Sequence, residues 1–154
     1  MVRFLYEAIS DSEEGTIRFG ECLGRALRSR AVIGLVGPLG AGKTRMVQGI
    51  ARGVGYGGRV RSPSFALLHV YRGRLTVRHF DLYRLETIDD GTAGEWEEAM
   101  EADGVSLVEW ADRIPELLPE GAMIIRLAPE GIMRRRIRVD FDLPTRAIGD
   151  WSLT

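Results

Sequence analysis

The first third of the chain alternates between helical and strand-like hydrophobic patterns. Asp11 or Ser12 can cap a helix whose apolar residues then recur every three or four positions, on one face. That face is made of Phe19, Cys22, Leu23, Ala26 and Leu27. The apolar run Ala31–Val36 predicts a short buried strand. A second helix is expected to begin near Lys43, with apolar residues turned inward, and to end in "RGVGYGG".

The rest of the chain continues the alternation. Strands are expected at Ala66–Tyr71 and Leu75–Phe80, joined by a turn at Gly73. A helix is expected near Thr92–Glu101, opening with a capping-box pattern at its first residue. The segments "GVSLVEW", "AMIIRL" and "RRIRVDF" predict three further strands, and "DRIPELLP" predicts a short helical turn.

This order of elements predicts an α/β fold. Because the glycine-rich segment "GPLGAGKT" lies between the expected strand at Ala31–Val36 and the helix that follows it, we expect a three-layer sandwich of the P-loop NTPase kind, with a mixed, mainly parallel central sheet. The chain has 154 residues and shows no repeats or linkers, so residues 1–154 are expected to form a single domain. The tail after about residue 144 is expected to be loosely ordered.

Composition indicates where the protein works. The net charge of −1 gives no global basic field for non-specific nucleic-acid binding, and no apolar run approaches the roughly 20 residues that span a bilayer. The single cysteine, Cys22, excludes an internal disulfide and fits a reducing compartment. Acidic residues in "MVRFLYEAISDSEEG" stand where a signal peptide would be apolar. We therefore expect a cytoplasmic protein without a membrane span.

One motif carries specific chemistry. "GPLGAGKT", from Gly37 to Thr44, matches the phosphate-binding pattern G-x-x-x-x-G-K-[ST] in full. Lys43 is the one lysine among 21 basic residues, and its compact charge suits the β- and γ-phosphates of a nucleotide. The Thr44 hydroxyl can ligate Mg²⁺. The residues expected to line the nucleotide are Gly37, Pro38, Leu39, Gly40, Ala41, Gly42, Lys43, Thr44 and Arg45.

Three carboxylates follow apolar stretches and are candidates for the metal and the reaction. Asp81 and Glu109 come where a strand would deliver a side chain to the ligand crevice of the sheet. Glu109 in "SLVEW" resembles a Walker B carboxylate. Asp140 lies within the last expected strand, between inward-facing positions, and is expected to be a solvated edge residue.

The order "GPLGAGKT", "SPSF", "HFDLYRL" and "VEW" resembles the bacterial TsaE (YjeE) ATPases, from "RFG" in the first helix to "RRIRV". The resemblance implies a role in threonylcarbamoyl modification of adenosine 37 in tRNAs reading ANN codons. It implies ATP and Mg²⁺ as cofactors, and TsaD and TsaB as partners. Direct contact with tRNA stays open.

The resemblance also implies residue roles. Lys43 would hold the phosphates, Thr44 and Glu109 the metal, and Asp81 would act near the γ-phosphate. Ser62–Phe65 would form a nucleotide-sensitive loop. Arg135 would close over the base, where Thr16 could also lie. Two departures stand out: Pro38 and Ser64 occupy positions where the family usually has Asp and Thr.

The sequence allows two interpretations for each of three further features. Trp110 either packs against the site or a partner, or is a core-edge aromatic. His79 is expected to position its neighbours rather than to transfer protons. Arg134–Arg138 reads as the exposed face of a strand, with tRNA contact as the alternative.

Two other functions compete with an ATPase. A small-molecule kinase would need an arginine-rich lid, for which Arg134–Arg138 is the candidate. A nucleotide sensor with negligible turnover would have less need of Asp81 near the γ-phosphate.

Overall fold

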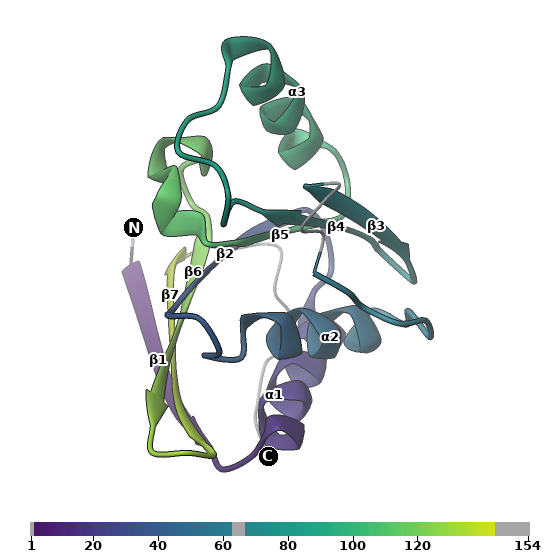
Figure 1. Ribbon diagram of the computed structural model, residues 1–154. Helices are drawn as coiled ribbons and strands as arrows, with labels where there is room; N and C mark the ends of the chain where they lie inside the picture. The colour runs from purple at the N-terminus through teal and green to yellow at the C-terminus, as the bar shows by residue number, and fades with distance from the viewer. Residues whose placement is uncertain (1, 63–66, 144–154) are drawn as a thin grey trace.

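The computed structural model describes residues 2–62 and 67–143, which form three layers. A seven-stranded sheet lies between helices α1 and α2 on one face and helix α3 with two 3-10 turns on the other (Figure 1). The strands are β1 (Val2–Ser10), β2 (Ala31–Val36), β3 (Leu68–Arg72), β4 (Thr76–Asp81), β5 (Val105–Glu109), β6 (Met123–Glu130) and β7 (Arg134–Leu143). The helices are α1 (Glu13–Ala26), α2 (Lys43–Gly53) and α3 (Asp90–Glu101), and the 3-10 turns are η1 (Ala111–Arg113) and η2 (Pro115–Leu117).

The sheet has the strand order β1-β7-β6-β2-β5-β4-β3. The central strands β6, β2, β5 and β4 pair in parallel, whereas β7, β1 and β3 are added through antiparallel pairings. The α/β fold with a mixed sheet is therefore confirmed. Because β2, β4 and β5 run in the same direction, the residues that follow them meet at one end of the sheet.

Alternation along the strands builds a core on each face of the sheet. On β2, Ile33 and Leu35 face α1 and α2, whereas Val32 faces α3 and the 3-10 turns. On β4, Val77 belongs to the first core and Phe80 to the second, where it contacts Trp96 of α3. Odd-numbered residues of β4 thus point toward α2, and His79 and Asp81 share that side.

Helices α1 and α2 approach each other very closely. A β-carbon placed on Gly49 would lie 2.2 Å from the backbone oxygen of Ile17, and one on Gly20 would lie 2.6 Å from that of Met46. The contact is lined by Gly20 and Gly24 of α1 and by Gly49 and Gly53 of α2. These glycines fix the position of α2, the helix that begins at the phosphate-binding motif.

Several expected elements are confirmed. The side chain of Ser12 caps α1 by accepting from the Gly15 N–H at 3.0 Å, and β2 and the start of α2 lie where predicted. The hairpin strands β3 and β4 begin one or two residues later than expected. Ala66, the loop residues 63–65 and the tail after residue 143 lie outside the described residues.

Two local predictions differ from the structure. The capping box at Thr92 is wrong, because Asp89 caps α3 and its carboxylate accepts from the Thr92 N–H at 2.9 Å. Strand β1 was not predicted, and it pairs along its full length with β7 at the far end of the chain.

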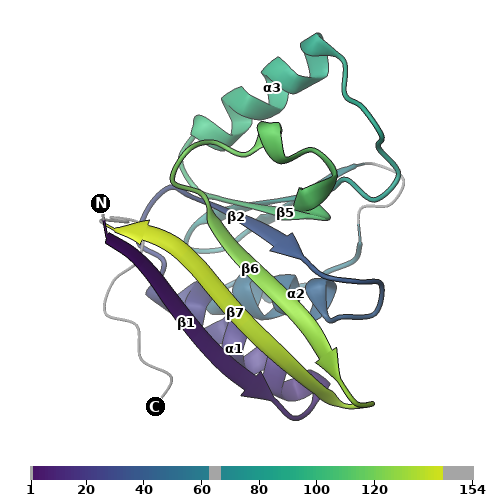
Figure 2. The ribbon, with the colours of Figure 1, turned by 90° about the vertical axis from the view of Figure 1, so that its left-hand side faces the viewer.

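Asp140 is buried at 6 % exposure, so its prediction as a solvated edge residue is wrong. Strand β7 is an interior strand between β1 and β6, and Arg126 and Arg138 approach the Asp140 carboxylate at 3.9 and 3.6 Å. Figure 2 shows these three strands with no helix in front of them. The arginines of β7 on this side pair with acidic neighbours, as expected of an exposed strand face.

None of the helices in residues 2–62 and 67–143 is long and apolar enough to cross a membrane.

Candidate nucleotide and metal site

The phosphate-binding motif forms a tight loop between β2 and α2. Gly40 and Gly42 adopt φ angles of 77° and 103°, a left-handed conformation that glycine adopts most readily. A β-carbon on Gly37 would lie 2.4 Å from the backbone oxygen of Leu127, so this position also needs glycine. The loop ends at the first residue of α2, where the N-terminal end of the helix dipole favours an anion.

Lys43 is folded back onto its own loop. Its ammonium donates to the backbone oxygens of Gly37 at 2.6 Å and Pro38 at 2.8 Å. Burial lowers the pKa of Lys43 below its ordinary value, while the nearby carboxylates Glu109, Asp112 and Asp81 oppose that shift. The lysine is therefore a desolvated cation held by two neutral carbonyl groups. An anionic phosphate would attract the ammonium more strongly than these carbonyl groups do.

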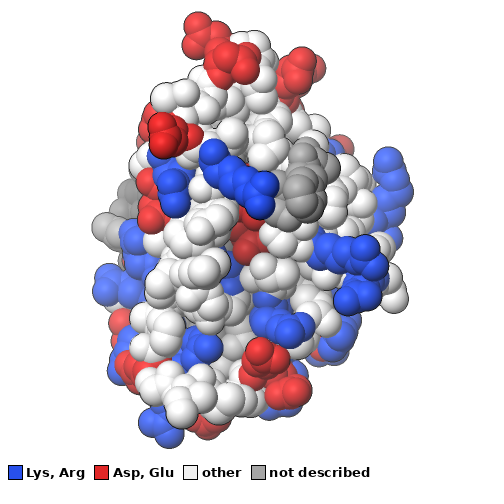
Figure 3. Space-filling model, viewed as in Figure 1, with Lys and Arg blue, Asp and Glu red and all other residues white. Residues whose placement is uncertain are grey.

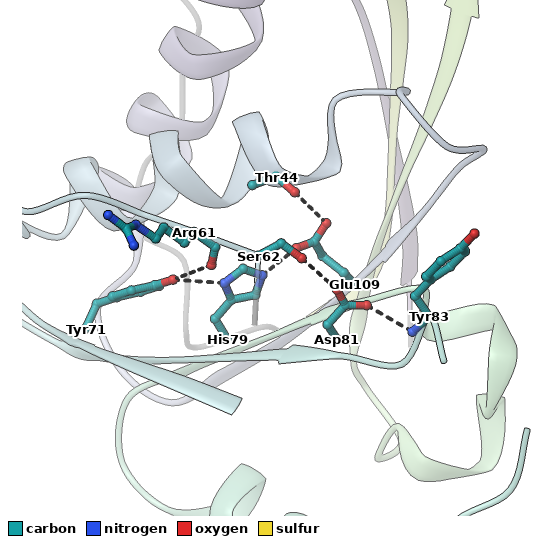
Figure 4. A network of polar contacts seen from close by, with 8 residues as sticks. All are labelled: Thr44, Arg61, Ser62, Tyr71, His79, Asp81, Tyr83 and Glu109. Carbon is teal, nitrogen blue, oxygen red and sulfur yellow. Dashed lines mark hydrogen bonds and ion pairs between the residues drawn. The ribbon is translucent and has the colours of Figure 1, made fainter. Parts of the chain in front are cut away.

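The two expected carboxylates come together at the ends of neighbouring strands. Asp81 of β4 is the register partner of Glu109 of β5. Glu109 Oε1 accepts from the Thr44 hydroxyl at 3.0 Å, and Asp81 accepts from the Ser62 hydroxyl at 2.8 Å and from the Tyr83 N–H at 2.9 Å (Figure 4). Asp81, Glu109, Thr44 and Lys43 line one pocket with the loop. The structure thus assembles four residues that the sequence spreads over 67 positions.

The donor set fits Mg²⁺ better than a cation that needs a full protein cage. Thr44 and Glu109 offer a hydroxyl and a carboxylate oxygen, which are hard ligands. In the described part of the chain, no group of three or more His, Cys, Asp or Glu side chains could hold a metal. Mg²⁺ commonly binds through one or two protein groups plus water and substrate phosphates, so two protein ligands beside a phosphate cradle suffice.

A second layer of buried polar side chains lies behind Glu109. His79 Nε2 is 2.5 Å from Glu109 Oε2, and His79 Nδ1 is 3.1 Å from the Tyr71 hydroxyl (Figure 4). Tyr71 in turn donates to the backbone oxygen of Arg61 at 3.0 Å. Burial raises the pKa of the Tyr71 phenol.

These three contacts in series need three protons between them. The Tyr71 hydroxyl supplies one, so His79 and Glu109 share the other two. Either His79 carries both protons and Glu109 is a carboxylate, or each of the two side chains carries one proton. In both arrangements the pair has no net charge. That balance matters because His79 and Glu109 are 0 % and 3 % exposed, and an unpaired charge at such a depth is costly.

Trp110 packs against the site and also against the second hydrophobic core, so both interpretations of this residue find support. Its backbone has a φ of 58°, and its ring centroid lies 3.9 Å from the Lys43 ammonium. Tyr83 and Arg113 pack against the same ring system, with 4.8 Å between the centroids of Trp110 and Tyr83. Trp110 therefore covers the lysine side of the pocket.

A second pocket adjoins the loop. Arg135, at the start of β7, donates to the backbone oxygen of Gly40 at 3.1 Å. Thr16 and Arg45 line the same pocket, together with Ser12, Glu13, Gly40, Gly42, Ile132, Met133 and Arg135. This is where the resemblance places the nucleotide base. Pro38 and Leu39 lie on the loop itself, and Leu39 is exposed at its tip, whereas Ala41 is buried beneath it.

Of the other arginines in the run, Arg134 contacts Asp11 and Arg136 contacts Glu7 and Glu130.

Tyr71 is a candidate functional residue that was not predicted from the sequence. Its parity on the expected hairpin strand was available as a signal, but its contact with His79 depends on the β3–β4 register. Of the expected nucleotide-sensitive loop, Ser62 contacts Asp81, and residues 63–65 lie outside the described residues.

The chain is similar to known proteins over most of its length. The family model "Threonylcarbamoyl adenosine biosynthesis protein TsaE" matches residues 10–137. The tRNA threonylcarbamoyladenosine biosynthesis protein TsaE of Treponema pallidum is 41% identical over 119 residues, covering 77% of this chain and 88% of that protein. Its Synechocystis counterpart is 39% identical over 106 residues, covering 66% and 68%. The crystal structure of Bacillus subtilis YdiB superposes with a TM-score of 0.78 at 28% identity, covering 92% and 88% of the two chains.

Proposed function

The chain belongs to the TsaE family of threonylcarbamoyl adenosine biosynthesis proteins, and on that premise we propose that it is the Mg²⁺-dependent ATPase subunit of the pathway. It would hydrolyse ATP to ADP and phosphate in support of the TsaB and TsaD proteins, which carry out the transfer to adenosine 37. The observation that carries the proposal is the single pocket that joins Lys43, Thr44, Asp81 and Glu109.

Each residue of that pocket has a role that follows from its chemistry. The loop amides and Lys43 would bind the phosphates, and the ammonium would exchange its carbonyl partners for phosphate oxygens. Thr44 and Glu109 would hold Mg²⁺, which when bound neutralises charge on the β- and γ-phosphates. Arg135 and Thr16 would enclose the base.

Asp81 is the group that would favour hydrolysis over simple binding. Its oxygens accept from Ser62 and Tyr83, which fixes the carboxylate while leaving lone pairs for a water molecule. In hydrolysis that water would attack the γ-phosphorus and the bond from phosphorus to the bridging oxygen of ADP would break. One proton of the water would stay on the released phosphate and the other would pass to solvent. Phosphoryl transfer depends mainly on such positioning and on charge, so one fixed carboxylate would be enough to orient the attacking water.

The kinase alternative finds less support. A kinase lid would bring several arginines over the transferred phosphate. Arg135 reaches the loop at Gly40, whereas Arg134, Arg136 and Arg138 contact acidic side chains on and beside the sheet. A protein that serves tRNA modification in this way would work in the cytoplasm.

Phosphate release from Mg·ATP tests the proposal, measured with the purified protein alone and with TsaB and TsaD added. We expect release that the partners stimulate and that Lys43→Ala abolishes. Asp81→Asn should lose release while it keeps ATP binding, because amide and carboxylate have the same size but the amide is a poorer partner for water. Tight binding of ATP without release under either condition would contradict the ATPase and favour the sensor. Transfer of phosphate to a small molecule would favour the kinase.

A further inference from the structure

We propose that Tyr71 and His79 are positioning residues that join the metal-side carboxylate, Glu109, to the start of the loop that carries Ser62. The inference rests on the proposed function of the pocket, because it concerns how that pocket is held and read. It adds a connection between metal binding and a loop, carried by two residues that do not touch the nucleotide pocket themselves.

The contacts form one continuous path. Glu109 Oε2 meets His79 Nε2 at 2.5 Å, His79 Nδ1 meets the Tyr71 hydroxyl at 3.1 Å, and that hydroxyl reaches the Arg61 backbone oxygen at 3.0 Å. His79 and Tyr71 are buried, at 0 % and 5 % exposure. A path without competing water holds its geometry better than a chain of surface contacts.

The path ends next to a second, independent anchor. Ser62 follows Arg61 directly and donates to Asp81 at 2.8 Å. Two adjacent backbone positions are thus tied to the two carboxylates of the pocket, Arg61 to Glu109 through two side chains and Ser62 to Asp81 directly (Figure 4). A change in the orientation of either carboxylate reaches the same short segment.

The orientation of Glu109 is the quantity that this path controls. With Oε2 held by His79, Oε1 is left facing the Thr44 hydroxyl at 3.0 Å. Thr44 and Oε1 are the pair that would hold Mg²⁺, so fixing Oε2 prepares Oε1 for the cation. Side chains behind a metal ligand commonly act in this manner, and losing one costs about 10- to 100-fold in metal affinity or activity.

Neither residue is a catalytic residue. Among the described residues that line the pocket with Lys43 and Asp81, neither His79 nor Tyr71 is present. Tyr71 also stacks against Tyr56 and His79, with ring centroids 4.9 and 5.9 Å apart. These ring contacts survive removal of the hydroxyl, so the hydroxyl can be tested separately from packing.

Tyr71→Phe is the decisive variant, and Tyr56→Phe is its matched control. The Tyr56 hydroxyl also donates to an arginine backbone oxygen, that of Arg59 at 3.3 Å, but this hydrogen bond is exposed, whereas that of Tyr71 to Arg61 is partly buried. We would measure the Mg²⁺ concentration for half-maximal phosphate release and the affinity for ATP without Mg²⁺. Tyr71→Phe should raise the Mg²⁺ requirement about tenfold and leave Mg²⁺-free ATP binding unchanged. Tyr56→Phe should change neither.

Trypsin supplies a readout at the other end of the path. The Arg61 carbonyl belongs to a bond that trypsin cleaves, and Tyr71→Phe should speed cleavage there relative to wild type. His79→Gln, which can still donate to Glu109, should retain more Mg²⁺ affinity than His79→Leu. If Tyr71→Phe lowered the folded fraction, this His79 pair, measured at equal folded fraction, would decide instead.

The inference and the proposed function fail in different ways. An unchanged Mg²⁺ requirement in Tyr71→Phe, equal to that of Tyr56→Phe, would overturn the inference even in an active ATPase. Absence of phosphate release from the wild type would overturn the proposed function. In that case the same variants would be compared by Mg²⁺-dependent binding of ADP, which judges the path without requiring turnover.

Discussion

Lys43 shows how one residue can be prepared for a ligand. Its ammonium is held by the backbone oxygens of Gly37 and Pro38 and covered by the ring of Trp110. These partners are neutral, and burial disfavours the charge that they surround. A phosphate group would offer the ammonium two negatively charged oxygens in their place, so the exchange of partners favours ligand binding.

Trp110 should report that exchange. Nucleotide binding should draw the Lys43 ammonium from its position 3.9 Å from the ring centroid, a contact worth about 0.5–2 kcal/mol. We expect tryptophan fluorescence to change on addition of Mg·ADP. The change should vanish in Trp110→Phe, which keeps the other two tryptophans of the sequence, Trp96 on α3 and Trp151. An equal change in Trp110→Phe would show that the signal arises elsewhere.

The Tyr71 phenol should keep its proton to a pH above the ordinary pKa of tyrosine. Burial raises the pKa of its phenol, so the folded protein keeps the proton at a pH where the unfolded chain, with an ordinary pKa near 10, has lost it. The contribution of this raised pKa to the free energy of unfolding is therefore fully present below about pH 10. It is lost as the pH rises through the raised pKa. Alkaline titration of tyrosinate absorbance should show a late phase that Tyr71→Phe removes. Tyr56→Phe should keep this phase but move it to a somewhat lower pH, because burial is the main cause of the raised Tyr71 pKa and the charge of Tyr56 adds to it. A late phase that persists in Tyr71→Phe would contradict the assignment.

At the scale of elements, prediction succeeded where the pattern was local. Ser12 and the apolar face of α1, the run Ala31–Val36 and the start of α2 were read from neighbouring residues. The cap of α3 failed because Asp89 and Thr92 are both good cap residues, and the pattern that starts at Thr92 hid the one three positions earlier. Strand β1 was missed because Leu5 and Ile9 lie on its exposed side, where polar residues would have given the alternating pattern.

The candidate site divides in the same way. The motif gave the loop, and strand ends gave Asp81 and Glu109. The contact of His79 with Glu109 could not be read from the sequence, because it depends on the register that pairs Asp81 with Glu109. Asp140 was misjudged for a related reason, since its burial depends on β1, a strand that was not expected.

The glycine contact between α1 and α2 makes a sharp prediction about elements. Gly49→Ala would place a β-carbon 2.2 Å from the Ile17 backbone oxygen, so the helices must separate. We expect a loss of about 1–3 kcal/mol in the free energy of unfolding, or more, measured by denaturant. Gly94→Ala on α3 is the matched control, because a β-carbon there meets nothing within 4 Å. It should stabilise by up to about 1 kcal/mol through helix propensity. Equal effects of the two variants would contradict close packing.

At the scale of the whole molecule, negative charge is concentrated at the end of the protein that carries α3. Acidic side chains gather over α3 at the top of Figure 3. The segment from Glu86 to Asp103 carries eight exposed acidic residues and no basic ones. The negative charge of this end would repel an RNA backbone.

The site itself draws on almost the full described chain, from Thr16 on α1 to Arg135 at the start of β7. A ligand that contacts α1, the loop, β4, β5 and β7 binds only when all of them are folded, and it therefore stabilises the whole molecule. At a concentration 100 times its dissociation constant, the ligand should add about 2.7 kcal/mol, which corresponds to a rise in Tm of about 5–10 °C for a chain of this size. Differential scanning calorimetry with Mg·ADP should show this rise in the wild type and lose it in Lys43→Ala. That variant loses the two hydrogen bonds of the ammonium, which stabilise the fold, and also the cost of burying its charge. Because these two effects oppose each other, the Tm without ligand should stay close to that of the wild type. A rise of the same size in Lys43→Ala would mean that the stabilising ligand binds outside this pocket.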